Sequence, residues 1–135
     1  MESKIIKFIN KHHVMTLATQ GLDGLYCANA FYAFDSQSSA LIFSTDVTTR
    51  HGANMVANSH VAASIVLETK VVGRIQGAQI TGRVVEATPA DLSLYLSKFP
   101  YAAVMELTMW RLEIDYLKLT DNTLGFGKKL IWNRE

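Results

Sequence analysis

Residues 13–35 read HVMTLATQGLDGLYCANAFYAFD, and this stretch indicates the fold class of the chain. Residues 13–20 and 25–35 are rich in β-branched, aromatic and other apolar residues, a composition typical of strands. Between them, Asp23-Gly24 is a strong signal for a hairpin turn. We therefore predict two antiparallel strands joined by a turn at residues 21–24.

The segments that follow the hairpin extend this β-rich pattern. The alternation of apolar and charged residues over 110–115 predicts a strand, and the apolar run 61–67 predicts a strand buried on both faces. Gly77 and Gly82 interrupt a further strand at 76–87 and indicate bulges or bends. With a strand at 40–45 and short helices at 5–9, at 48–58 and from Thr88 onward, the pattern predicts a mainly β fold. We expect a six-stranded antiparallel β-barrel that forms a single domain over residues 1–135.

Composition excludes several classes of protein. The 135 residues include 13 Lys and Arg against 12 Asp and Glu, so the net charge of +1 lacks the basic excess of a general nucleic-acid binder. A hydrophobic fraction of 49% argues against disorder, yet no run approaches the roughly 20 apolar residues of a membrane helix. Cys27 is the only cysteine, which excludes an intramolecular disulfide. We expect a cytoplasmic protein with no nucleic-acid or membrane partner.

The segment 43–51, FSTDVTTRH, carries the clearest candidate for a binding site. A predicted strand ends in Ser44 and Thr45, and a predicted helix then begins near Thr49 and Arg50. Helix N-termini present unpaired N–H groups and a partial positive charge, which favour phosphate. The alternative is that the threonines only cap the helix and that Arg50 is a solvated surface charge.

Other candidate chemistry is less well supported by the residue pattern. The four histidines lack the spacing of a metal site, so no metal is predicted. Cys27 lies in an apolar strand, and we interpret it as a residue of the core or of a pocket wall rather than a nucleophile. Asn29 interrupts the same strand, and its amide either is satisfied within the core or contacts a ligand. Gln76 and Gln79 pose the same question on another strand. Lys128, Lys129 and Trp132 form either a cationic, aromatic arm over a ligand or a solvated tail.

In this order, the segments resemble the pyridoxamine 5′-phosphate oxidase-like, FMN-binding split-barrel superfamily. The resemblance covers residues 13–87, including the helix near Thr48 and the strand Gln79-Ile-Thr-Gly82-Arg-Val84. More narrowly, two segments look like the uncharacterised YhbP-like branch of that superfamily. These are Leu25-Tyr-Cys-Ala-Asn-Ala-Phe-Tyr32 and Thr120-Asp-Asn-Thr-Leu-Gly-Phe-Gly-Lys-Lys-Leu-Ile-Trp132.

The resemblance implies a split barrel of the FMN-binding type, and a homodimer with FMN in a groove between the subunits. It places the flavin phosphate and ribityl chain near residues 44–51 and the ring beside residues 27–32. A glutamine near Gln76 faces the ring in relatives, and the C-terminal residues complete the pocket of the partner subunit. The implied cofactor-binding residues are Ala28, Asn29, Ala30, Ser44, Thr45, Thr49, Arg50, His51, Gln76, Lys128 and Trp132.

Three departures from the family pattern bear on function. His51 stands where many relatives have lysine, and Cys27 stands where the family has arginine, so two positive charges are missing. The ending Asn133-Arg134-Glu135 replaces an Arg-Leu-x-Pro-like ending, so pyridoxamine phosphate oxidation is not expected. The resemblance implies an FMN-dependent oxidoreductase of unknown substrate, because the flavin itself carries the redox chemistry. The alternatives are a non-catalytic flavin-binding or electron-relay module, and a split barrel that binds haem or the deazaflavin F420. Haem would require His51 or His60 as axial ligand.

Overall fold

The computed structural model describes residues 1–125 and 127–135. Phe126, which belongs to the C-terminal segment that resembles the YhbP-like branch, lies outside the described residues. The α-helices are α1 (Ser3–Lys11), α2 (Arg50–Ala57) and α3 (Pro89–Lys98), and the short 3₁₀ helices are η1 (Val72–Arg74), η2 (Pro100–Val104) and η3 (Asn122–Leu124). The strands are β1 (Val14–Gly21), β2 (Gly24–Phe31), β3 (Ala33–Asp35), β4 (Ala40–Ser44), β5 (His60–Val66), β6 (Gln76–Glu86), β7 (Met109–Asp121) and β8 (Lys129–Asn133).

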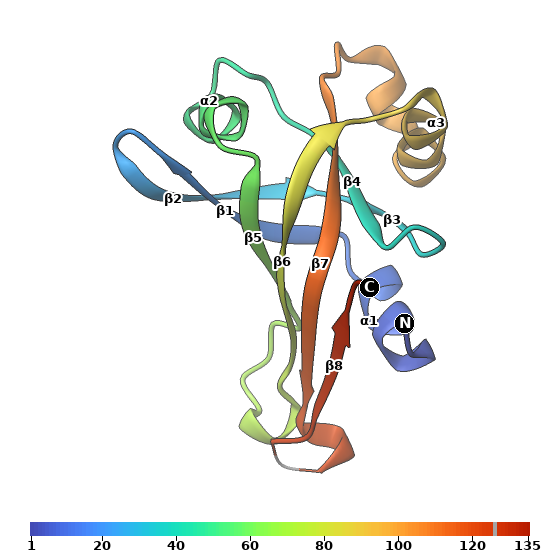
Figure 1. Ribbon diagram of the computed structural model, residues 1–135. Coiled ribbons are helices and arrows are strands. Elements are labelled where there is room, and N and C mark those ends of the chain that lie inside the picture. Colours follow the sequence, from blue (N-terminus) through green and yellow to red (C-terminus); the bar gives the residue numbers. More distant parts are fainter. Residues whose placement is uncertain (126) are drawn as a thin grey trace.

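The strands form one antiparallel sheet in the order β2-β1-β5-β6-β7-β4-β3, with β8 added beside β7. The sheet curls into a half-open barrel, in which the long strands β6 and β7 run from one end of the molecule to the other (Figure 1). Helices α2 and α3 lie at one end of these strands (Figure 1), and α1 contacts β3. The predicted mainly β split-barrel fold is therefore confirmed.

The sheet has eight strands where the sequence predicts six. The predicted strand 25–35 divides at the buried Tyr32, after which Ala33–Asp35 leave β1 and pair with β4. The extra strand β8 pairs with β7 in the glycine-containing tail, where the sequence shows no clear alternation. Both differences depend on which strands pair with each other, which short local patterns do not encode.

Strand β5 corrects another expectation. Val61, Ala63 and Ile65 are buried in the core, whereas Ser64 and Val66 on the opposite face are exposed. The prediction that residues 61–67 are buried on both faces was wrong, because an apolar run does not show whether anything covers its second face.

Local signals near the strand and helix ends are confirmed. The side chain of Thr88 accepts a hydrogen bond from the Asp91 backbone, and the Asp91 side chain accepts one from the Thr88 backbone, so a capping box starts α3. The register between β6 and β7 shifts at Thr81/Gly82. A Cβ atom at Gly82 would overlap the backbone carbonyl of Glu113, so this bulge requires glycine.

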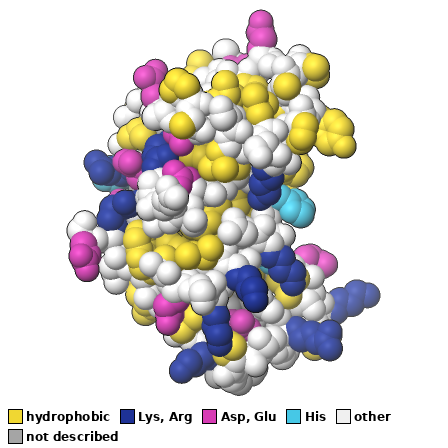
Figure 2. Space-filling model, turned by 90° about the vertical axis from the view of Figure 1, so that its right-hand side faces the viewer, with side chains coloured by type: hydrophobic (Ala, Val, Ile, Leu, Met, Phe, Trp, Pro, Cys, Tyr) yellow, Lys and Arg dark blue, Asp and Glu magenta, His cyan; other side chains and the backbone are white. Residues whose placement is uncertain are grey.

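The two ends of the barrel differ in surface character. Seen from the α1 and β8 side, Lys and Arg side chains gather over the lower half, and hydrophobic side chains are prominent at the upper end (Figure 2). Among the described residues, none of the helices combines the length and apolar character needed to cross a membrane.

Candidate functional site

A cavity of about 710 Å³ opens at the end of the barrel that carries α2 and α3. Its walls come from the end of β2, the end of β4 with the loop that follows, the first turn of α2, and the segment from α3 through η2. The lining residues are Asn29, Ala30, Phe31, Ser44, Thr45, Asp46, Thr49, His51, Tyr95, Phe99, Tyr101, Ala102, Met105 and Leu107.

One wall of this cavity is polar and is anchored to β7. Thr45 is buried, its N–H donates to the Thr108 carbonyl at 3.0 Å, and its carbonyl accepts from Trp110 Nε1 at 3.0 Å. The Thr45 hydroxyl lies 3.3 Å from His51 Nε2. Burial lowers the pKa of His51 below its ordinary value near 6.5, so the ring is neutral at pH 7. His51 therefore offers this wall a hydrogen-bonding group without a positive charge.

The loop between β4 and α2 is held tightly by its own hydrogen bonds. The backbone N–H and the hydroxyl of Thr48 donate to Asp46 Oδ1 at 2.8 and 2.9 Å, and these bonds lower the pKa of Asp46. The Thr49 hydroxyl donates to the Asp46 carbonyl at 2.6 Å and accepts from Gly52 N at 3.1 Å. A Cβ at Gly52 would overlap the Asp46 carbonyl oxygen, so glycine permits the helix to approach the loop this closely. Thr49 is thus the N-cap of α2, which agrees with the alternative that the threonines cap this helix.

Arg50 lies at the first position of α2 but does not line the cavity in this conformation. Its guanidinium sits 4.2 Å from the ring centroid of Tyr26, and Nη2 lies 3.4 Å from the Asp23 carbonyl oxygen. The side chain is exposed and rests on the β1–β2 hairpin. It is therefore next to the expected phosphate position and directed away from it.

Strand β2 contributes Asn29 and Ala30 to the cavity, while Ala28 lies between them and the exposed Cys27. Asn29 is exposed, and its Oδ1 accepts a hydrogen bond from the Thr16 hydroxyl at 2.9 Å. The interpretation of Asn29 as a core amide was therefore wrong. Cys27 is likewise not a core residue, although it lines a shallow hollow on the outer face of the sheet.

Three of the implied cofactor residues, Gln76, Lys128 and Trp132, lie away from the cavity. Ser44 pairs with Met109 at one end of β7, whereas Lys129, next to Lys128, pairs with Thr120 near the other end. At about 3.3 Å per residue, this separation along the strand is roughly 35 Å. Gln76 pairs with Asp121 at that same far end, and Trp132 pairs with Leu117 and packs on the core. One chain alone does not bring Gln76, Lys128 and Trp132 to the cavity.

Sequence reasoning missed the second wall of the cavity, which is apolar. Phe99 lies between Phe31 and Tyr95, with ring centroids 5.5 and 5.0 Å away, and η2 adds Tyr101 and Ala102. The concentration of aromatic residues over 95–101 is the signal that the sequence offered for this wall. After Lys98 the apolar residues of this segment follow neither a helical nor a strand spacing, so the sequence alone does not assign the segment to a site.

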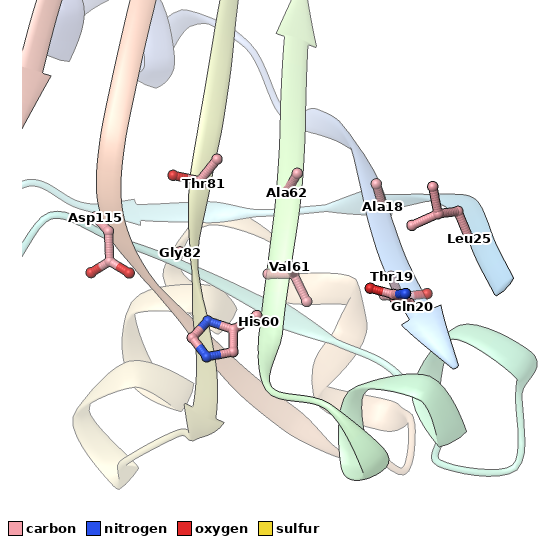
Figure 3. A pocket seen from close by; sticks show the side chains of 10 residues that line it. All are labelled: Ala18, Thr19, Gln20, Leu25, His60, Val61, Ala62, Thr81, Gly82 and Asp115. Carbon is pink, nitrogen blue, oxygen red and sulfur yellow. The ribbon is translucent and has the colours of Figure 1, made fainter. Parts of the chain in front are cut away.

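The outer face of the sheet carries a separate hollow (Figure 3). Ala18, Ala62 and Thr81 occupy neighbouring positions on β1, β5 and β6, so small side chains form its floor. His60 lines this hollow and not the cavity that contains His51 (Figure 3). Across residues 1–125 and 127–135, no group of three or more His, Cys, Asp or Glu is placed to hold a metal ion.

The curled antiparallel sheet, with a polar and aromatic cavity at one end, defines a split-barrel protein. A model of the family described as pyridoxamine 5'-phosphate oxidase matches residues 1–116, and the chain belongs to this family.

Relatives and solved structures agree with this assignment. A UPF0306 protein from Serratia proteamaculans is 41% identical over 138 residues, covering 98% of this chain and 95% of its own. The UPF0306 protein YhbP from Salmonella paratyphi B is 41% identical over 133 residues, covering 96% and 90%. The chain therefore lies in the YhbP-like branch.

Similar solved structures share the fold at low identity. They include a heme binding protein from Mycobacterium smegmatis, with a TM-score of 0.78, 15% identity and 93% of this chain covered. This chain spans about half of that protein, 55% of its length. A FAD-binding protein from Mesorhizobium loti has a TM-score of 0.69 and 16% identity, with 84% of this chain and 87% of that protein covered.

Proposed function

We propose that this protein binds FMN in the cavity, at the interface of a homodimer, and acts as a flavin-dependent oxidoreductase. The observation that carries the proposal is the convergence of Asn29, Ala30, Ser44, Thr45, Thr49 and His51 on one cavity. These residues come from three separate segments, and the family resemblance implies a cofactor-binding role for each of them. At about 710 Å³, the cavity falls within the usual range for small-molecule and cofactor sites.

The phosphate end of FMN would lie against the loop 44–49 and the start of α2, where hydroxyls and helix N–H groups favour an anion. Arg50 must leave Tyr26 to reach it. An exposed cation–π contact contributes about 0.5–1 kcal/mol, whereas a charge-assisted hydrogen bond contributes about 1.5–3 kcal/mol. The exchange therefore favours the phosphate, and Arg50 would act as its cationic anchor.

The ring would lie between β2 and the aromatic wall. FMN, when bound, supplies reversible hydride and electron transfer. Asn29 and the backbone of Ala30 would orient the ring from one side, and its other side would face Phe31 and Phe99 across the remaining space of the cavity. His51 would donate or accept a hydrogen bond in its neutral form.

The homodimer is proposed from the outer face of the sheet and from the far end of β7. The face presents small, uncharged side chains at Ala18, Ala62 and Thr81, which permit close approach of a second copy (Figure 3). The dimer would also deliver Gln76, Lys128 and Trp132 of the partner subunit to the cavity. Gln76 and Lys128 lie at the end of β7 that includes Lys129, because Gln76 pairs with Asp121 and Lys129 pairs with Thr120. The partner would therefore supply the positive charge that the cavity wall lacks.

Haem is the second candidate, because His51 lines the cavity and solved relatives of this fold include a heme binding protein. The pKa of His51 is lowered by burial, and a neutral imidazole is the form that ligates iron. The colour of the purified protein separates the two, since flavin is yellow and haem is red. A colourless protein that binds neither FMN nor haem would contradict both candidate cofactors.

Arg50→Ala tests the anchor directly. We expect FMN affinity to fall by roughly tenfold or more, because the phosphate loses a charge-assisted contact. Quenching of flavin fluorescence during titration measures the dissociation constant. Arg50→Lys is the matched variant, since it retains the charge without the planar fork and should give an intermediate affinity. Unchanged affinity in Arg50→Ala would reject Arg50 as anchor.

His51→Lys should have the opposite effect. Lysine restores the cation that many relatives carry at this position, so FMN affinity is expected to rise by roughly tenfold. In the unaltered protein, affinity should rise as the pH falls through the pKa of His51, which burial lowers below its ordinary value, because protonation makes the ring cationic; His51→Lys should remove this dependence. His51→Gln stays neutral and serves as control. Equal affinities for the lysine and glutamine variants would contradict a phosphate position near residue 51.

A further inference from the structure

The apolar wall of the cavity exposes several large hydrophobic side chains to solvent. Tyr101 is 89% exposed, Met105 is 64% exposed and Phe31 is 54% exposed, although all three border the same cavity. Large apolar side chains gathered around a cavity mark a surface that is covered by a ligand. Phe31 and Phe99 pack against each other in this wall, at 5.5 Å between centroids and near edge-to-face.

The charge of the same cavity limits what can cover this wall. Among its described lining residues, Asp46 is the only one with a formal charge at pH 7, and none is Lys or Arg. His51 is neutral there, because burial lowers its pKa. Lys98 adjoins Phe99, with Nζ 5.4 Å from the ring centroid, but Nζ donates to the carbonyls of His12 and Tyr32 at 3.0 Å each. The ammonium group of Lys98 is thus already hydrogen-bonded to the backbone, and we do not expect it to bind a ligand in the cavity.

We propose that the wall formed by Phe31, Phe99, Tyr101 and Met105 binds an uncharged planar aromatic substrate, and that the cavity discriminates against aromatic compounds carrying phosphate or carboxylate. The substrate ring would lie on the aromatic side chains, between this wall and the proposed flavin, where offset or edge-to-face contact is favourable. An anionic substituent would lose hydration beside Asp46, and the cations of the proposed site, Arg50 and Lys128 of the partner subunit, would already be paired with the flavin phosphate. As a statement about substrate, this inference rests on the proposed flavin function; as a statement about ligand binding, it is measurable by itself.

A pair of probes that differ only in charge tests the selectivity. Calorimetric titration of the protein with FMN added should show 1-naphthol binding at least about tenfold more tightly than 1-naphthyl phosphate. Equal or tighter binding of the phosphate would overturn the inference, whatever the affinity for FMN. FMN binding is measured in the same samples by fluorescence quenching. If FMN does not bind but naphthol does so selectively, the flavin proposal fails and the aromatic site stands.

Two exposed positions next to each other provide a charge-introducing variant and its control. Met105→Lys places a cation on the rim of the cavity, whereas Val104→Lys adds the same charge at a 93% exposed side chain outside the lining. Met105→Lys should raise affinity for 1-naphthyl phosphate by roughly tenfold and weaken binding of 1-naphthol. Val104→Lys should leave both affinities unchanged. Identical behaviour of the two variants would show that the probes bind elsewhere and would overturn the proposed site.

Discussion

Replacing Arg111 with Met should lower the free energy of unfolding by about 3–5 kcal/mol, because it leaves a buried carboxylate without its cation. Arg111 Nη1 lies 2.9 Å from Asp91 Oδ1, and these side chains are only 13% and 5% exposed. The same guanidinium contacts Asp35 at 3.5 Å and hydrogen-bonds Ser38 in the β3–β4 turn. Arg111 therefore joins the start of α3, and with it the aromatic wall of the cavity, to the sheet.

Urea denaturation followed by circular dichroism measures this loss. Arg83→Met is the matched control, since Arg83 is exposed on the neighbouring strand β6 and pairs in register with Glu113. Its free energy of unfolding should change by less than about 0.5 kcal/mol. A loss below about 1 kcal/mol in Arg111→Met would contradict a supporting role for this ion pair.

Gly52→Ala should reduce FMN affinity by about 100-fold, equivalent to roughly 2.7 kcal/mol. The added methyl group would overlap the Asp46 carbonyl and approach the Thr49 hydroxyl at 2.8 Å, so the loop 46–49 must move away from α2. This movement displaces the hydroxyl and N–H groups that would hold the phosphate. The overlap also adds a destabilisation of about 1–3 kcal/mol, typical of overpacked sites.

Gly73→Ala separates the loop effect from a general effect of the substitution. Gly73 lies in η1 at the opposite end of the barrel, and a Cβ there would meet no atom within 4 Å. The FMN affinity and the stability of the Gly73→Ala variant should remain close to those of the unaltered protein. Both variants are compared by flavin titration and by thermal unfolding. A Gly52→Ala protein that binds FMN normally would mean that the 46–49 loop does not hold the cofactor.

Local sequence signals predicted the parts of the fold that local chemistry controls. The Asp23-Gly24 turn joins β1 to β2 as expected, and Thr88 with Asp91 starts α3 through hydrogen bonds between residues three apart. Such features depend on neighbours in the chain, and a single sequence is sufficient to recognise them.

Features that depend on which strands pair, or on which face packs on the core, were not predictable in the same way. Ala33–Asp35 form a strand only because Ala40–Ile42 lie beside them, and Lys129–Asn133 form a strand only on β7. The exposure of Cys27 likewise depends on which face of the hairpin packs on the core. These outcomes are set by tertiary packing, which overrides local propensity.

The candidate site was predicted in part. The family resemblance implies cofactor residues in the segment 43–51 and at the end of β2, and six of these residues line one cavity in the structure. Gln76 and Trp132 were assigned to the same cofactor, yet β7 holds them far from the cavity within one chain. Their role would need a second subunit, and no pattern within the sequence specifies how two copies meet.

The most direct test of the account is an absorbance spectrum of freshly purified protein, followed by titration with FMN. The account predicts flavin bands in the spectrum, or tight stoichiometric binding of added FMN with quenching of its fluorescence. A featureless spectrum together with no FMN binding would contradict it, and the oxidoreductase proposal would then fall while the split-barrel fold would stand.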